Sequence, residues 1–279
     1  MSAHIDRNFV RINEGLVHYR SRGDRTSARP LVMLHASPAS SVSVLPLMRA
    51  LKGAQPLVAP DTLGNGDSVP IGLEQPEIPD YAEALGRVLD ALDIPEIDIY
   101  GSHTGASIAM ELAIAQPQRV RRLVLDGIGL YAPDELADIL ANYAPEIEPN
   151  KIGSQFTWAW HFVRDQAFFF PWFKRDAAHA RSGGLPSADA LHATVVEVLK
   201  SIRTYHLAYR AAFRHPKRER LPLVTVPTLV LGDSSDPLFP TQEEVCALVP
   251  GGRMGPINDE DGDSVSHRKA RAIERFLAS

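Results

Sequence analysis

The chain has 279 residues, 44% of them hydrophobic, so it can bury a sizeable core as one large α/β domain or as a domain with an inserted subdomain. A formal net charge of −5 gives no electrostatic reason to expect a nucleic-acid partner or an anionic membrane surface. The single cysteine, Cys246, excludes an intramolecular disulfide framework and a thiolate metal cluster. The first fifteen residues lack the pattern of a signal peptide, and no apolar run approaches the roughly 18 residues of a membrane span, so we expect a cytoplasmic protein.

Short apolar segments alternate with longer segments of helical pattern in two blocks. In the first block the pattern predicts strands at 8–13, 16–20, 30–35, 56–61, 97–101 and 121–127, with helices near 41–52, 80–92 and 104–116. In the second block it predicts a strand at 227–233, a helix near 241–248, a strand at 253–257 and a closing helix at 266–277. A hairpin-like start followed by β–α alternation indicates a mostly parallel sheet of eight strands covered by helices on both faces.

The region between the two blocks has a different composition. Nine of the chain's twenty aromatic residues fall within the segment 153–173, among them Trp158, Trp160 and Trp172. These rings are expected to form the core of a small helical subdomain, and some of them to line an apolar pocket beneath it. We therefore expect 1–132 and 219–279 to form one core, with 133–218 inserted as a helical cap.

Four motifs follow successive predicted strands: LHASP at 34–38, PDTLGNGDS at 60–68, GSHTG at 101–105 and LGDSSDP at 231–237. In their order and spacing they resemble the α/β-hydrolase family, in the branch that carries a helical cap. The resemblance covers roughly 10–130 and 220–279, and in the cap it is one of position only. GSHTG has the glycine spacing of a nucleophile elbow, a sharp strand-to-helix turn, and its apex is His103.

The resemblance implies an oxyanion hole and a catalytic acid. The backbone N–H of Thr104, just after the apex, and that of Ser37 in the HASP loop are expected to donate to a developing oxyanion. His35 is more typical of a loop-shaping residue than of a substrate contact, but both interpretations stay open. Asp236 occupies the usual position of the family's acid, and Asp126 occupies an alternative one, where a loop-bonding carboxylate is also expected.

Two departures from the family pattern bear on the mechanism. The apex is histidine where the family has Ser, Asp or Cys, and Ser102 precedes the apex, so it is expected to point away from the pocket. The loop after the last strand, where the family places its catalytic histidine, reads NDEDGDS, and His267 lies beyond it in the closing helix. Asp259 and Asp261 in this loop are further candidate partners of His103.

An imidazole with an ordinary pKa of about 6.5 exchanges protons near neutral pH, and a carboxylate on one ring nitrogen fixes its tautomer. We therefore expect His103 to act as a general base in the hydrolysis of a small ester, lactone, amide or activated C–C bond, without a serine nucleophile. The alternatives are lyase or proton-abstraction chemistry at the same site, and a non-catalytic small-molecule-binding protein.

No cofactor or metal is expected, because the chain has no dinucleotide fingerprint, no phosphate-binding loop and no paired-histidine motif. The expected partner is a small-molecule substrate, and the oligomeric state stays open. His161, among the aromatic residues of the insert, is a further candidate substrate contact, with packing as the alternative.

Overall fold

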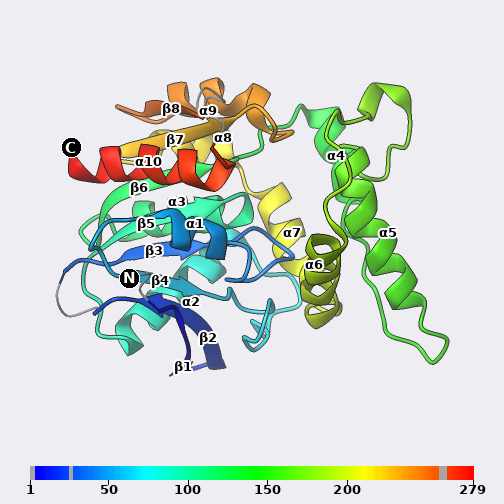
Figure 1. The fold of residues 1–279 in the computed structure, drawn as a ribbon, viewed down its shortest axis with the longest axis horizontal. Coiled ribbons are helices and arrows are strands. Elements are labelled where there is room, and N and C mark those ends of the chain that lie inside the picture. The colour runs from blue at the N-terminus through cyan, green and yellow to red at the C-terminus, as the bar shows by residue number, and fades with distance from the viewer. Residues whose placement is uncertain (1–3, 25–27, 258–262) are drawn as a thin grey trace.

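A computed structural model describes residues 4–24, 28–257 and 263–279, and it contains one eight-stranded sheet (Figure 1). The strands are β1 (Asp6–Ile12), β2 (Gly15–Arg22), β3 (Leu31–Leu34), β4 (Leu57–Pro60), β5 (Ile97–Ser102), β6 (Val120–Asp126), β7 (Thr228–Asp233) and β8 (Arg253–Ile257). Their order across the sheet is β1-β2-β4-β3-β5-β6-β7-β8. Only the pairings of β2 with β1 and with β4 are antiparallel; the other described pairs are parallel. The predicted α/β fold is thereby confirmed.

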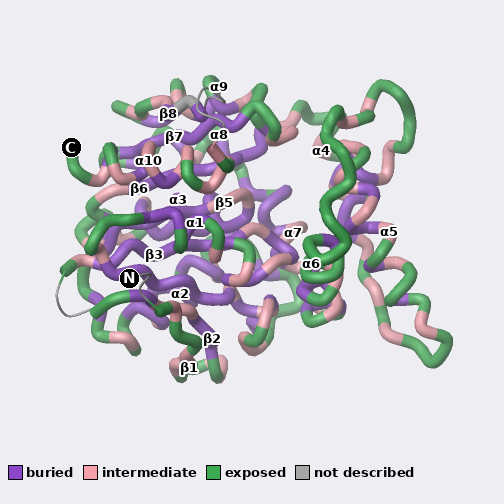
Figure 2. Tube along the Cα trace, viewed as in Figure 1, coloured by how far each residue is buried: buried purple, intermediate pink, exposed green. Residues whose placement is uncertain are grey.

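Helices cover both faces of the sheet. They are α1 (Leu45–Ala50), α2 (Ile78–Ala91), α3 (Thr104–Ala115), α9 (Gln242–Leu248) and α10 (Val265–Ala278). Successive residues of a strand point to opposite faces, so Leu31 and Met33 of β3 join the core beneath α1 and α10, while Val32 and Leu34 join the core beneath α2 and α3. Figure 2 shows the central strands as almost continuously buried tube between these layers, whereas no residue of the edge strand β1 is buried.

The local sequence explains the two helices nearest the site. α2 begins with a reciprocal capping box between Glu77 and Asp80, which satisfies amide groups that the first helical turn leaves unpaired. α3 is apolar on nearly every side, and ten of its twelve residues are buried. A helix with this pattern needs partners all round, and α3 packs against β5, β6, α2 and α7.

Four helices of the segment between β6 and β7 lie at one end of the sheet (Figure 1). They are α4 (Pro133–Asn142), α5 (Ser154–Phe168), α6 (Ala188–Lys200) and α7 (Tyr205–Arg214), and the short α8 (Lys217–Arg220) leads back to the sheet. Their apolar side chains form a separate core, in which Trp158 stacks on Phe162 with ring centroids 4.8 Å apart. No helix among the described residues is long and apolar enough to cross a membrane.

α7 belongs to two cores at once. Ala208, Ala211 and Ala212 pack into the main core against α3, whereas Tyr205 and Phe213 pack into the core of the inserted segment. Small residues on one side of the helix let it approach the sheet layer closely, and aromatic residues on the other side fill the insert.

Candidate active site

His103 lies at the turn between β5 and α3, with φ 53° and ψ −109°. A positive φ is rare for a residue other than glycine and requires support from its surroundings. That support comes from close packing: a Cβ at Gly101 would lie 2.2 Å from the carbonyl oxygen of Gly105, and a Cβ at Gly105 would lie 2.6 Å from that of His35. The two glycines of GSHTG therefore permit the sharp turn that presents the His103 side chain.

The His103 ring is paired with Asp236. Its Nε2 atom lies 2.7 Å from Oδ2 of Asp236, which follows β7, and the other carboxylate oxygen accepts a 2.8 Å hydrogen bond from Leu238 N–H. An ionised carboxylate only accepts hydrogen bonds, so Nε2 carries a hydrogen and Nδ1 is the nitrogen with the free lone pair when the ring is neutral. The contact joins residues 133 positions apart, through strands that end at the same edge of the sheet.

The pairing shifts the pKa of both groups. Burial disfavours the charged form of His103, but the hydrogen bond and negative charge of Asp236, with the charge of Asp126, outweigh it and raise the pKa of His103 above its ordinary value. Burial acts against ionisation of Asp236 as well, yet the hydrogen bond from His103 lowers the pKa of Asp236 to about 2. The pair therefore favours an imidazolium beside a carboxylate, and His103 is a stronger base than a free imidazole.

A cavity of about 410 Å³ opens above this pair, a volume within the usual range of small-molecule sites. Ser37, from the loop after β3, and Thr104, the first residue of α3, line it together with His103 and Asp236. The first amides of a helix have no partner within the helix, so the N–H of Thr104 is of the kind that binds an oxyanion. The structure thus brings the two predicted oxyanion residues to the same cavity as the histidine.

Asp126 has partners other than the His103 ring. Its carboxylate accepts a hydrogen bond from Tyr100 Oη and lies 2.7 and 3.0 Å from Nζ of Lys269 on α10. Only its backbone oxygen contacts His103, by accepting a 2.8 Å hydrogen bond from the His103 N–H. The Asp126 carboxylate therefore binds side chains of β5 and α10, not a loop as expected, and Asp236 is the carboxylate on the His103 ring.

Lys269 is a residue that sequence reasoning missed. It lines the cavity, and its side chain is 16% exposed. Burial lowers its pKa, but the charge of Asp126 and the hydrogen bond to it outweigh burial and raise the pKa above the ordinary value. Lys269 precedes the buried Ile273 and Phe276 by four and seven positions, so it lies on the core-facing stripe of α10. This spacing is the sequence signal from which the buried position of Lys269 could have been predicted.

The residues predicted to contact the substrate do not line the cavity. His35 is buried, and its ring bridges two backbone groups: Nδ1 lies 2.8 Å from Ala36 O, and Nε2 accepts a 2.9 Å hydrogen bond from Thr62 N–H. It shapes the loop after β3 and is not among the cavity-lining residues.

The candidate substrate contacts of the insert do not line the cavity either; they are Trp158, Trp160, His161 and Trp172. Trp158 and Trp172 pack in the core of the insert, and Trp160 is 41% exposed on α5.

Other aromatic residues form the cavity wall. They are Tyr131, Tyr143, Phe169, Phe170, Tyr209 and Phe213. Two of them come from α7 and two from the turn after α5, so the segment between β6 and β7 supplies this wall, but the three tryptophans expected there do not contribute to it. The predicted segment contained Phe169 and Phe170, and nothing in their spacing separated them from the neighbouring tryptophans.

The remaining candidates are not brought to the described cavity. Ser102, at the end of β5, is absent from its lining. His267 lies on α10, exposed, with Nδ1 2.8 Å from Ser264 Oγ. Asp259 and Asp261 fall outside the described residues.

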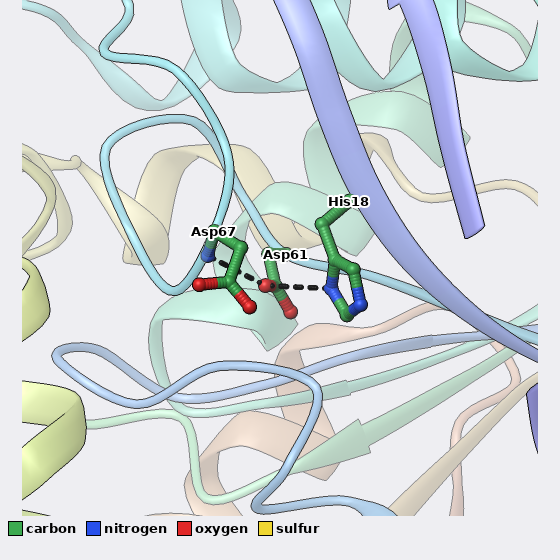
Figure 3. A group of neighbouring side chains, drawn as sticks. All are labelled: His18, Asp61 and Asp67. Atoms are coloured by element: carbon green, nitrogen blue, oxygen red, sulfur yellow. Dashed lines mark hydrogen bonds and ion pairs between the residues drawn. The ribbon is translucent and has the colours of Figure 1, made fainter. Parts of the chain in front are cut away.

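His18, Asp61 and Asp67 form a second polar cluster (Figure 3). Its donor atoms are already occupied: Nδ1 of His18 lies 2.9 Å from Asp61 Oδ2, while Nε2 accepts a hydrogen bond from Arg7 Nε. Burial opposes ionisation of Asp61, but hydrogen bonds from His18 and from the amides of Asp67 and Ser41 hold its pKa well below the ordinary value. The cluster fixes the loop after β4 and does not resemble an open metal site.

This sheet, its strand order and a histidine–carboxylate pair at the carboxyl ends of β5 and β7 define a hydrolase-like architecture. A family model for the alpha/beta hydrolase fold matches residues 29–252. The chain belongs to this family.

Two curated relatives share part of the sequence. The chain is 36% identical over 138 residues to 2-hydroxy-6-oxononadienedioate/2-hydroxy-6-oxononatrienedioate hydrolase of Paraburkholderia xenovorans (strain LB400), covering 46% of each chain. It is 38% identical over 113 residues to 2-hydroxymuconate semialdehyde hydrolase of Pseudomonas sp. (strain CF600), covering 37% of this chain and 38% of that one. The match therefore spans less than half the length of these relatives.

Solved structures match along nearly the whole chain. The enol-lactonase from Burkholderia xenovorans LB400 has a TM-score of 0.72 at 16% identity, covering 98% of this chain and 100% of that chain. A bromoperoxidase from Bacillus anthracis has a TM-score of 0.73 at 17% identity, with the same coverage. At these identities the likeness describes the fold.

Proposed function

We propose that this chain hydrolyses a small, partly apolar carbonyl compound, with His103 as general base and no serine nucleophile. The observation that carries the proposal is the position of the His103 ring: held at a strained turn, paired through Nε2 with Asp236 at 2.7 Å, and lining a cavity with Thr104 and Ser37. A base, its orienting carboxylate and two candidate oxyanion donors around one cavity are the parts that such a reaction requires.

In the proposed reaction, Nδ1 of His103 takes a proton from water as the water oxygen attacks the carbonyl carbon. The carbonyl oxygen becomes an oxyanion that accepts hydrogen bonds from the backbone N–H groups of Thr104 and Ser37. Collapse of the tetrahedral intermediate breaks the bond to the leaving group, which takes the proton back from His103. Asp236 stabilises the imidazolium that forms in between.

The named activities of the relatives suggest which substrates to test. They include hydrolases of 2-hydroxy-6-oxo acids and an enol-lactonase. A panel of p-nitrophenyl esters, lactones and 2-hydroxy-6-oxo-dienoates therefore covers esters, cyclic esters and activated C–C bonds. The His103→Ala variant is expected to lose about 10²- to 10⁴-fold in kcat/KM on the active substrate. The His267→Ala variant, which changes an exposed histidine outside the cavity, is the matched control and is expected to keep its activity. Full activity in His103→Ala would refute the proposal.

Two further measurements distinguish the proposed hydrolysis from lyase chemistry and from direct nucleophilic attack by His103. Oxygen from ¹⁸O-labelled water is expected in the product, whereas a lyase reaction leaves it unlabelled. Rapid-quench mass spectrometry is expected to show no acyl group on the protein, since an acyl adduct on His103 would indicate direct nucleophilic attack.

A further inference from the structure

Lys217 is a buried cation in the wall of the same cavity. It is the first residue of α8, is 7% exposed and lines the cavity together with His103 and Asp236. Its Nζ donates a hydrogen bond to the backbone oxygen of Ala212, in the last turn of α7. A lysine ammonium has three N–H donors, so this contact leaves two of them to be satisfied.

No carboxylate of the described residues forms an ion pair with Lys217. The nearby acid on α3, Glu111, already accepts two 2.7 Å hydrogen bonds from Arg220 and lies 2.9 Å from Nε2 of His215. Burial, with no opposing charge, lowers the pKa of Lys217 to about 8. A buried ammonium without a counter-ion is unfavourable, and an anion bound in the cavity would relieve that cost.

The other charged cavity residues already have partners. Lys269 is paired with Asp126, and the His103 ring with Asp236. Asp233 accepts hydrogen bonds from Ser235, and Arg181 donates to the backbone oxygens of Gln166 and Ser235. Within the described part of the chain, the buried ammonium of Lys217 thus has one hydrogen-bond partner, a backbone oxygen, and no carboxylate partner.

α3 runs from the His103 turn toward the segment that carries Lys217. Thr104 and Ser107 line the cavity along one face of α3, and Glu111, one turn further on, meets His215, two residues before Lys217. At 1.5 Å per residue, Glu111 lies about 10 Å along the helix from Thr104. Lys217 and His103 line the same cavity, so a ligand that fills it can contact both side chains.

We propose that Lys217 binds a carboxylate of the substrate, so that the chain acts on an aromatic or unsaturated acid whose reacting carbonyl reaches His103. This inference rests on the proposed function, because it takes the same cavity as the substrate site. A single ammonium suits a monoanion, and Asp233 and Asp236 in the same lining oppose a more highly charged ligand. The aromatic wall suits the apolar part of such a molecule.

The test measures binding and needs no turnover. Phenylacetate, 3-phenylpropionate and 4-phenylbutyrate are titrated into the full-length protein at neutral pH by calorimetry, each beside its neutral amide. At least one acid is expected to bind about 10-fold or more tightly than its amide. In the Lys217→Met variant that acid is expected to lose about 10- to 100-fold in affinity, since a charge-assisted hydrogen bond is lost. The Lys52→Met variant, which changes an exposed lysine, is the matched control and is expected to leave affinity unchanged.

Proton uptake provides a second readout, which can be measured in the wild type and does not depend on the folding of Lys217→Met. Near pH 8 part of the Lys217 population is neutral, so binding an anion draws a proton onto it, and titrations in two buffers of different ionisation enthalpy reveal the uptake. The uptake is expected in the wild type and absent in Lys217→Arg, which stays charged while keeping the affinity for the acid.

Several outcomes would overturn the inference. They are equal binding of acids and amides, binding of no acid in the series, or an acid preference that persists unchanged in Lys217→Met. Binding of acids by a His103→Ala protein that has no activity supports the inference about Lys217. Activity on neutral esters without acid binding supports the proposed function alone, so the two failures are distinguishable.

Discussion

Gly127 leaves the space that the imidazole of His103 fills. A Cβ built on Gly127 would lie 2.7 Å from both Cδ2 and Nε2 of His103 and 3.1 Å from Oδ2 of Asp236. The residue after β6 therefore determines whether the ring can reach its carboxylate.

Gly127→Ala is expected to displace the His103 ring and to lower both activity and stability. The new methyl group adds a steric clash of about 1–3 kcal/mol to the cost of a positive φ, about 1–2 kcal/mol. Gly72→Ala is the matched control, because Gly72 has φ +79°, close to the +75° of Gly127, with no atom within 4 Å of its Cβ position. Chemical denaturation of both variants checks this. Equal losses in the two variants would mean that Gly127 is needed for its φ alone.

The His103–Asp236 pair is expected to stabilise the fold within a defined pH window. The pKa of Asp236 falls from 3.8 to about 2 on folding, so its contribution is present above about pH 4 and is lost as the pH falls through about 2. The pKa of His103 is raised on folding, so its contribution is present below about pH 6.5 and is lost as the pH rises through the folded value.

Asp236→Asn is therefore expected to lower the free energy of unfolding by about 2 kcal/mol between about pH 4 and 6.5, with a smaller difference outside that window. Urea denaturation across the pH range measures the difference. A loss that does not vary with pH would show that Asp236 stabilises the fold by some means other than this pair.

The Lys269–Asp126 pair is expected to behave as a buried ion pair. Removing one partner leaves the other charge buried and unpaired, so Lys269→Met and Asp126→Asn are each expected to cost about 3–5 kcal/mol. The double variant is expected to cost much less than the sum of the two, as shown by a double-mutant cycle. Additive losses would contradict the pairing.

The same two side chains are expected to tune His103 in opposite directions. The positive charge of Lys269 lowers the pKa of His103, and the negative charge of Asp126 raises it. A general base works in its neutral form, so kcat/KM is expected to rise with pH through a pKa above 6.5. Lys269→Met should move the rising limb of the kcat/KM pH profile to higher pH, and Asp126→Asn should move it to lower pH. Limbs that coincide in all three proteins would exclude His103 as the titrating base.

Much of the fold could be predicted because the main signals are local. Val32 and Leu34 alternate with Leu31 and Met33, and the apex of GSHTG is fixed by its flanking glycines. Asp236 was expected only through the resemblance to the α/β-hydrolase family, which places its acid after the strand that follows the insert.

The cavity depends instead on contacts between distant segments, which spacing does not encode. Lys269 sits on the buried stripe of a helix that is otherwise highly charged, and Lys217 belongs to a run of basic residues that suggests a solvated turn. In both cases the charged residue type led us to expect an exposed position, whereas the side chain is largely buried. Of the six aromatic residues in the cavity wall, only Phe169 and Phe170 lie in the predicted segment 153–173, because residues far from it in the sequence also reach the cavity.

α7 forms part of the cavity wall and packs against two different parts of the molecule. Its alanines are seated in the sheet layer, and its aromatic residues Tyr209 and Phe213 face the insert and the substrate space. Divergence in either packing partner thus reshapes the space available to a ligand without altering His103 or Asp236. The width of the cavity can therefore change through substitutions in the packing around α7 that leave the His103–Asp236 pair in place.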